Sequence, residues 1–225
     1  AAATISGWRG DGTGRYPKSA PPVEWGDKKN VKWTAKVGKT GYASPVLMGS
    51  RVIVPCEPNE LYCVNLADGK VLWDKKIVPA DLSANEQKSV PEETGQTGLF
   101  CPTPVSDGKY VYAVLGNGIV ACFDAEGNRA WTRHIDQPVT NQYGRSASPL
   151  LTGGKLIVHA ANLTALNPQD GKQLWEAKDT DASYGSPVAA KIGDVDVAIT
   201  PAGAVVRISD GKVLAKGIST AIHTS

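Results

Sequence analysis

The chain has 225 residues, among them 24 glycines and 15 prolines, and its formal net charge is +2. So small a charge, without a cluster of lysine and arginine, argues against a nucleic-acid partner. No apolar run is long enough to cross a bilayer as a helix. The abundance of turn-forming residues instead favours a fold of many short strands.

Residues 1–30 are predicted to form an extension that precedes the main domain, which we place at residues 31–225. The segment Asp11-Gly12-Thr13-Gly14 predicts a turn and not a phosphate-binding loop, because no helix follows it. Val31–Ala35 is predicted to be a strand carrying a Trp. Three companion strands do not precede it, so we expect it to latch onto strands from elsewhere, as the outer strand of a sheet.

From residue 36 two landmarks recur four times in the same order. One is a hydroxyl residue before proline, at Ser44, Thr103, Ser148 and Ser186. The other is a Gly-bearing turn that leads into a Trp, at Trp73, Trp131 and Trp175, with Ala215 in the fourth copy. Successive landmark prolines are 59, 45 and 38 residues apart. Landmarks that recur at this period indicate a repeat architecture.

Each repeat contains four short runs in which apolar and polar residues alternate, typical of strands, and we predict no amphipathic helix. In the first repeat the runs are residues 42–47, 51–55, 61–65 and 70–77. Four antiparallel strands per repeat of about 40 residues, with Trp in the last, is the pattern of a β-propeller blade. We predict an all-β propeller, with blades at about residues 36–77, 98–135, 144–179 and 183–219, and the start of a fifth at 220–225.

The segment from Cys63 to Trp73 resembles the blade signature of the pyrroloquinoline-quinone-type propellers, Ala-x-Asp-x-x-x-Gly-Lys-x-x-Trp. Ala165 to Trp175 resembles it too, and Gly7 to Gly14 is similar to the opening of secreted bacterial members. The resemblance implies an eight-bladed ring, of which this chain supplies about half. It also implies that the three Trp side chains wedge between neighbouring blades.

The four cysteines leave two interpretations open. A two-residue turn at Asn59-Glu60 would set Cys56 directly opposite Cys63, where a disulfide needs only modest approach. Alternatively all four are small buried residues. Cys101 and Cys122 are expected on the first and third strands of one blade, which are not neighbours.

Candidate binding residues are expected where the inner strands enter the central channel. Counting back three residues from each landmark proline gives Tyr42, Cys101, Ser146, Tyr184 and, from an expected proline at position 226, His223. Counting back four gives Arg145. Side chains of these types, placed in an arc around the channel mouth, suit an anionic or planar ligand. Alternatively, the same residues simply solvate the channel mouth. The histidines lack metal-ligand spacing, so no metal site is predicted.

The insertion at residues 78–97 is expected to cap the channel, to meet a partner, or to be a plain surface elaboration. Two functions remain open. One is a non-catalytic periplasmic or secreted scaffold that binds a protein or small ligand on the channel rim, similar in plan to the propeller lipoproteins of outer-membrane β-barrel assembly. The other is an alcohol or sugar dehydrogenase that uses pyrroloquinoline quinone with calcium. The predicted rim positions offer it neither an adjacent cysteine pair nor a carboxylate.

The chain begins Ala-Ala-Ala-Thr without Met, which is consistent with a cleaved signal peptide or with an edited chain. The expected partners are the remaining half of the propeller or a second chain, and a protein on the rim.

Overall fold

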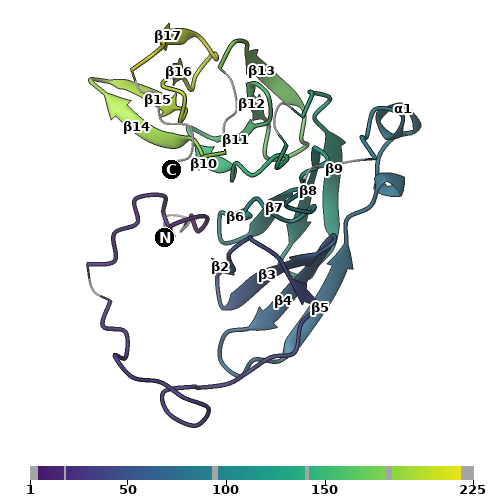
Figure 1. Cartoon of the computed structure of the whole chain (residues 1–225), viewed down its shortest axis with the longest axis vertical. Helices are drawn as coiled ribbons and strands as arrows, with labels where there is room; N and C mark the ends of the chain where they lie inside the picture. The colour runs from purple at the N-terminus through teal and green to yellow at the C-terminus, as the bar shows by residue number, and fades with distance from the viewer. Residues whose placement is uncertain (1–4, 18, 93–95, 140–141, 181–183, 219–225) are drawn as a thin grey trace.

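The structure is a computed structural model that describes residues 5–17, 19–92, 96–139, 142–180 and 184–218. It contains four antiparallel sheets, fanned around an open centre in the order of the sequence (Figure 1). The all-β propeller architecture predicted from the repeats is confirmed.

Each sheet is one blade, with strands in sequence order from the centre outward. Blade 1 comprises β2 (Val46–Met48), β3 (Arg51–Glu57), β4 (Glu60–Asn65) and β5 (Val71–Lys76), with β1 (Lys39–Thr40) added beside β3. Blade 2 comprises β6 (Val105–Ser106), β7 (Tyr110–Val114), β8 (Ile119–Asp124) and β9 (Arg129–His134). Blade 3 comprises β10 (Leu150–Thr152), β11 (Lys155–His159), β12 (Leu163–Leu166) and β13 (Gln173–Ala177). Blade 4 comprises β14 (Val188–Ile192), β15 (Val195–Ile199), β16 (Val205–Arg207) and β17 (Val213–Ala215).

The core lies between blades, because each internal sheet buries both of its faces. Along β7, Val111 and Ala113 pack toward blade 1, whereas Tyr112 and Val114 pack toward blade 3. Successive side chains of a strand point to opposite faces, which explains why a buried blade strand is apolar at consecutive positions. In all four blades the pairing of the third strand with the fourth also shifts register. In the first three blades the shift follows Cys63, Cys122 and Ala165, the residues at the first position of the blade signature.

Every described tryptophan of the repeat pattern docks on the turn of the next blade. The indole Nε1 of Trp73 donates to the carbonyl of Ala125 at 3.0 Å, and the ring covers Gly127 so closely that a Cβ there would lie 2.9 Å from it. The same dock recurs with its bond at 2.8–3.0 Å between Trp131 and Pro168, Trp175 and Ile208, and Trp33 and Leu66. The turn glycines therefore leave room for the preceding blade's Trp.

The segment Val31–Ala35 is not a strand, in contrast to the prediction. Within the described chain no strand of another blade lies beside it, so its backbone has no sheet to join. Trp33 nevertheless makes the same dock on blade 1 that each later Trp makes on the following blade. The segment thus occupies the place of an outer strand without the rest of a blade.

The landmark hydroxyls link the blades near the axis. The backbone N–H of Ser44 donates to Oγ1 of Thr103 at 3.0 Å. Thr103 N–H donates to Oγ of Ser148 at 3.1 Å, and Ser148 N–H donates to Oγ of Ser186 at 2.9 Å. This chain of bonds explains why a hydroxyl residue precedes the proline in the second, third and fourth repeats.

Two short helical turns, which the sequence did not predict, lie in the 78–97 insertion. They are η1 (Pro79–Asp81) and α1 (Ala84–Gln87), and Ser83 caps α1 by accepting from the backbone N–H of Glu86. Neither of these helices is long and apolar enough to span a membrane, and no other helix of the described residues is.

The disulfide hypothesis is wrong in this structure, where Cys56 and Cys63 are buried free thiols. The β3–β4 hairpin turns around Pro58, earlier than predicted, so Cys56 lies opposite Glu60 and Cys63 lies opposite Ile53, three residues away from the register that would pair the two cysteines. Burial raises the pKa of the Cys63 thiol to about 11 and that of Cys122 to about 12. Both behave as small core residues.

Candidate functional site

The rim of the half-ring is formed by the loops that enter the inner strands and by the loops between the second and third strands. On blade 1 it presents Tyr42, whose side chain is 74% exposed. Tyr42 shares an open hollow with Glu57 and Thr97, and the other residues lining this hollow are Lys39, Thr40, Gly41, Pro58, Gln96 and Gly98. The entering loop, the β3–β4 loop and the end of the insertion therefore meet at blade 1.

Glu57 shapes this hollow by holding a neighbouring loop. Its two carboxylate oxygens accept the backbone N–H groups of Leu99 at 3.1 Å and Phe100 at 2.8 Å. The carboxylate thereby fixes the loop that enters blade 2.

A second aromatic group continues the rim over blades 3 and 4. The rings of Tyr143 and Tyr184 meet edge to face with centroids 5.4 Å apart. Oγ of Ser146 donates to the carbonyl of Tyr184 at 2.9 Å, tying these entering loops together. Tyr143, 39% exposed, was missed by counting back from the landmarks because it lies five residues before its serine.

The end of the insertion connects the two aromatic groups. Gln96 N–H donates to the carbonyl of Gln142 at 3.2 Å, and Thr97 N–H donates to the carbonyl of Tyr143 at 3.4 Å. Because Gln96 and Thr97 also line the Tyr42 hollow, the three tyrosines lie along one continuous edge. We call Tyr42, Tyr143 and Tyr184 the rim tyrosines.

Arg145 lies beneath this surface, not on it. It is only 6% exposed, and its guanidinium donates to the backbone carbonyls of Gly116, at 3.3 Å, and of Gln137. Burial lowers the pKa of this guanidinium. The structure therefore corrects the expectation of a ligand-binding fork: the two terminal nitrogens of Arg145 hold two loops, and its buried Nε has no partner among the described residues.

The other two predicted rim positions differ in accessibility. Cys101 is partly buried behind Thr97, and burial raises the pKa of its thiol. His223 lies outside the described residues. Of the predicted positions, Tyr42 is exposed and Tyr184 is partly exposed.

The first half of the insertion packs against the side of blade 2 instead of capping the channel. Leu82 is buried in the core between blades 1 and 2, and Asp81 pairs with Arg129 at 2.6 Å. Glu86 accepts the backbone N–H of His134 at 3.1 Å, while Oγ of Ser89 lies 3.0 Å from Nδ1 of the same histidine. Burial lowers the pKa of His134.

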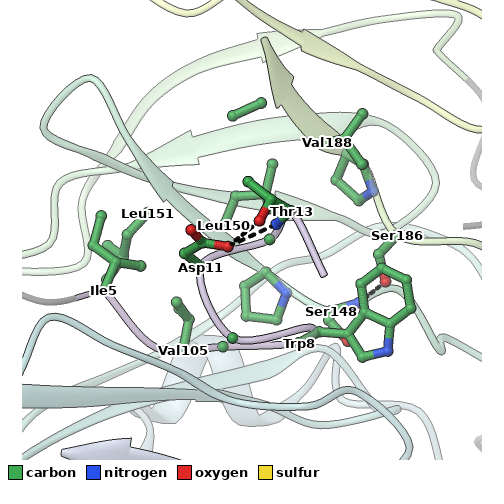
Figure 2. A pocket seen from close by; sticks show the side chains of 16 residues that line it. Ile5, Trp8, Asp11, Thr13, Val105, Ser148, Leu150, Leu151, Ser186 and Val188 are labelled. Atoms are coloured by element: carbon green, nitrogen blue, oxygen red, sulfur yellow. Dashed lines mark hydrogen bonds between the residues drawn. The ribbon is translucent and has the colours of Figure 1, made fainter. Parts of the chain in front are cut away.

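A separate cavity lies on the channel side of the inner strands, beneath residues 5–13 (Figure 2). Ser6 fastens this segment by exchanging two backbone hydrogen bonds with Ser106, at 2.8 and 2.7 Å, and by accepting the N–H of Leu47 on its Oγ. The chain then turns at Asp11, whose carboxylate accepts Thr13 N–H at 2.9 Å, as the turn prediction required. The segment crosses from blades 1 and 2 toward blades 3 and 4.

The residues present do not fit a quinone–calcium centre. Among the described side chains no three His, Cys, Asp or Glu gather as a metal site. The channel-side cavity measures about 170 Å³, close to a cavity that holds a single benzene ring, so a three-ring quinone exceeds it.

A protein-family model matches this chain over all four blades. The family model described as outer membrane protein assembly factor BamB matches residues 25–221. The chain belongs to this family. An outer membrane protein assembly factor BamB from Yersinia pestis is 26% identical over 151 residues, which are 66% of this chain and 33% of that protein. The chain thus spans about a third of that relative's length.

Solved structures agree at the level of the fold. BamB from Moraxella catarrhalis superposes with a TM-score of 0.58 at 14% identity, over 86% of this chain and 57% of that one. A quinohemoprotein alcohol dehydrogenase from Pseudomonas putida HK5 is 20% identical, over 64% of this chain and 22% of that one, with a TM-score of 0.48. The first likeness supports a partial BamB-like propeller; the second carries no functional argument.

Proposed function

We propose that this chain is part of a non-catalytic periplasmic scaffold that binds a protein partner through the rim tyrosines and serves the assembly of outer-membrane proteins. The single observation that carries the proposal is the row of three tyrosines along one edge, where Tyr42 and Tyr143 are exposed and Tyr184 is partly exposed beside Tyr143. Tyrosine is enriched in protein interfaces and among the residues that dominate binding energy. Membership of the BamB family supports the compartment and the process.

We also propose that further blades, from the same protein or from a second copy, complete the ring. Support comes from Trp33, which docks as an outer-strand Trp while its segment lacks sheet neighbours among the described residues. Sedimentation of the 225-residue chain tests this, since an incomplete ring is expected to self-associate. A compact monomer that is stable at all concentrations would contradict it.

The test of function uses the full-length protein in its own bacterium, with a photo-crosslinking amino acid at Tyr42 or Tyr184. The control position is Leu174 on β13, which is 49% exposed and lies on an outer strand far from the entering loops. Both rim positions are expected to capture the same protein, and Leu174 to capture none. Replacing Tyr42 and Tyr143 by Ala is expected to reduce capture from Tyr184 by about tenfold or more.

Capture from Leu174 alone, or an undiminished yield in the double variant, would overturn the rim as the binding surface. Reduction of an electron acceptor by the purified protein with alcohol, quinone and calcium would overturn the non-catalytic assignment and favour the dehydrogenase.

A further inference from the structure

The channel-side cavity beneath residues 5–13 has the size and walls of a binding site for one ring. Its volume of about 170 Å³ is close to that of a 150 Å³ protein cavity that stays dry and binds benzene. The walls are largely apolar, and the large apolar side chains among them are Ile5, Trp8, Val105, Leu150, Leu151 and Val188 (Figure 2).

Two buried hydroxyls give the cavity a polar side. Ser148 and Ser186 both line it and are 4% and 8% exposed. Each Oγ accepts a backbone N–H from the preceding blade, at 3.1 and 2.9 Å. Neither hydroxyl donates to any of the described residues, so each retains a proton for an acceptor placed in the cavity. A buried donor without a partner costs free energy, which a ligand oxygen would recover.

The N-terminal segment contributes an aromatic wall and sets the charge that the cavity tolerates. Trp8 lines the cavity, while the guanidinium of Arg9, which does not line it, lies 4.2 Å from the centre of the indole ring. Asp11 stands in the lining, and its hydrogen bonds from Thr13 lower the pKa of its carboxyl group. An anionic carboxylate in the lining disfavours a second anion.

We propose that this cavity binds a small neutral phenol. The ring packs between Trp8 and the inner strands of blades 3 and 4, and the phenol oxygen accepts from Ser148 or Ser186. This site is separate from the rim, and it does not depend on the function proposed for the rim tyrosines.

The experiment titrates the 225-residue protein with phenol, toluene and benzoate, using ligand-observed NMR for binding and thermal unfolding for stability. Phenol at ten times its dissociation constant is expected to raise Tm by roughly 3–6 °C. Toluene lacks the oxygen and is expected to bind 2–10-fold more weakly, a ratio of about one hydrogen bond. Benzoate is expected not to bind.

Matched variants separate the cavity from the rest of the blade. Ala189→Phe fills it from β14, where Ala189 is exposed and lines it, whereas Lys191→Phe places the same ring on the same strand outside the lining. Phenol binding is expected to be lost in the first and kept in the second. Replacing both Ser148 and Ser186 by Ala is expected to abolish the preference for phenol over toluene, a ratio that does not depend on the stability of the variant.

Trp8→Ala provides a second route, because Trp8 belongs to the N-terminal segment and to none of the three core clusters. It is expected to weaken phenol binding at least fivefold while the circular dichroism of the blades is unchanged. Absence of phenol binding to the parent protein, or equal phenol binding by the parent and by folded Ala189→Phe or Trp8→Ala, would overturn the proposal.

Discussion

The dock between each Trp and the next blade's turn predicts that two glycines of equal backbone conformation differ sharply in their tolerance of alanine. Gly171 has φ +70°, and a Cβ there would lie 2.5 Å from Cε3 of Trp131. Gly154 has φ +71°, and a Cβ there would meet nothing within 4 Å. Both changes incur the left-handed backbone penalty of about 1–2 kcal/mol. Gly171→Ala must also displace the indole ring.

The additional cost can be estimated from what the ring loses. Displacement breaks the bond from Trp131 Nε1 to the carbonyl of Pro168, worth about 0.5–1.5 kcal/mol. It also overpacks a boundary at which Trp131 is only 7% exposed, for about 1–3 kcal/mol. We expect Gly171→Ala to reduce the free energy of unfolding by about 3–5 kcal/mol, and Gly154→Ala by about 1–2 kcal/mol.

Urea unfolding followed by circular dichroism measures both values, and a double-mutant cycle identifies the cause. In the Trp131→Ala background the ring is gone, so Gly171→Ala is expected to cost no more than Gly154→Ala does. The other close neighbour of a Cβ at Gly171, Cγ of Arg133 at 2.8 Å, belongs to a flexible side chain that can move away. Equal costs for the two glycines, or an undiminished Gly171 effect without Trp131, would refute the docking argument.

Two further predictions concern the supports of the rim. Arg145→Ala removes the donors of two backbone carbonyls at a buried position. We therefore expect the free energy of unfolding, measured with urea, to fall by about 2–4 kcal/mol, while photo-crosslinking from Tyr42 per folded molecule is unchanged. Unchanged stability with lost crosslinking would contradict this prediction. Burial and the nearby Arg145 guanidinium hold the pKa of His134 below its ordinary 6.5, so the unfolded state binds more protons and stability falls as pH decreases below that value. The His134→Gln variant is expected to show a shallower decline between about pH 7.5 and 5.5, and an identical slope would assign the decline to other groups.

The sequence was sufficient for the blades because their local signals agree with their packing. Alternating runs, turn glycines and the Trp spacing all report one repeated sheet, and the observed strands of blade 1 begin and end within a few residues of the predicted runs. The disulfide hypothesis failed on the hairpin register: the strands turn around Pro58 instead of at Asn59-Glu60, and the pairing differs by three residues, which leaves Cys56 opposite Glu60 and not opposite Cys63. Nothing in the local pattern distinguishes these two turns.

The candidate site was harder to predict because exposure depends on loops from other repeats. Counting back from the prolines found Tyr42 and Tyr184, but it treated Arg145 as equivalent to them. Whether an arginine at the rim faces solvent or backbone depends on where the carbonyls of Gly116 and Gln137 lie, and both belong to neighbouring loops. Tyr143 was not predicted because the rim loops differ in length, so counting back a fixed number of residues from each proline does not give equivalent positions there.

One asymmetry of the sequence now has a physical explanation. The chain has four turn glycines under a Trp, at residues 69, 127, 171 and 211, but only three blades that carry their own Trp. Each glycine receives the Trp of the preceding blade, so the set is completed by Trp33 at the start. At each described boundary between blades, the chain is therefore joined twice, by an indole near the periphery and by a landmark hydroxyl near the axis. These two bonds sit at opposite ends of the blade and restrain its rotation about either one, so the orientation of neighbouring blades does not depend on the rim loops.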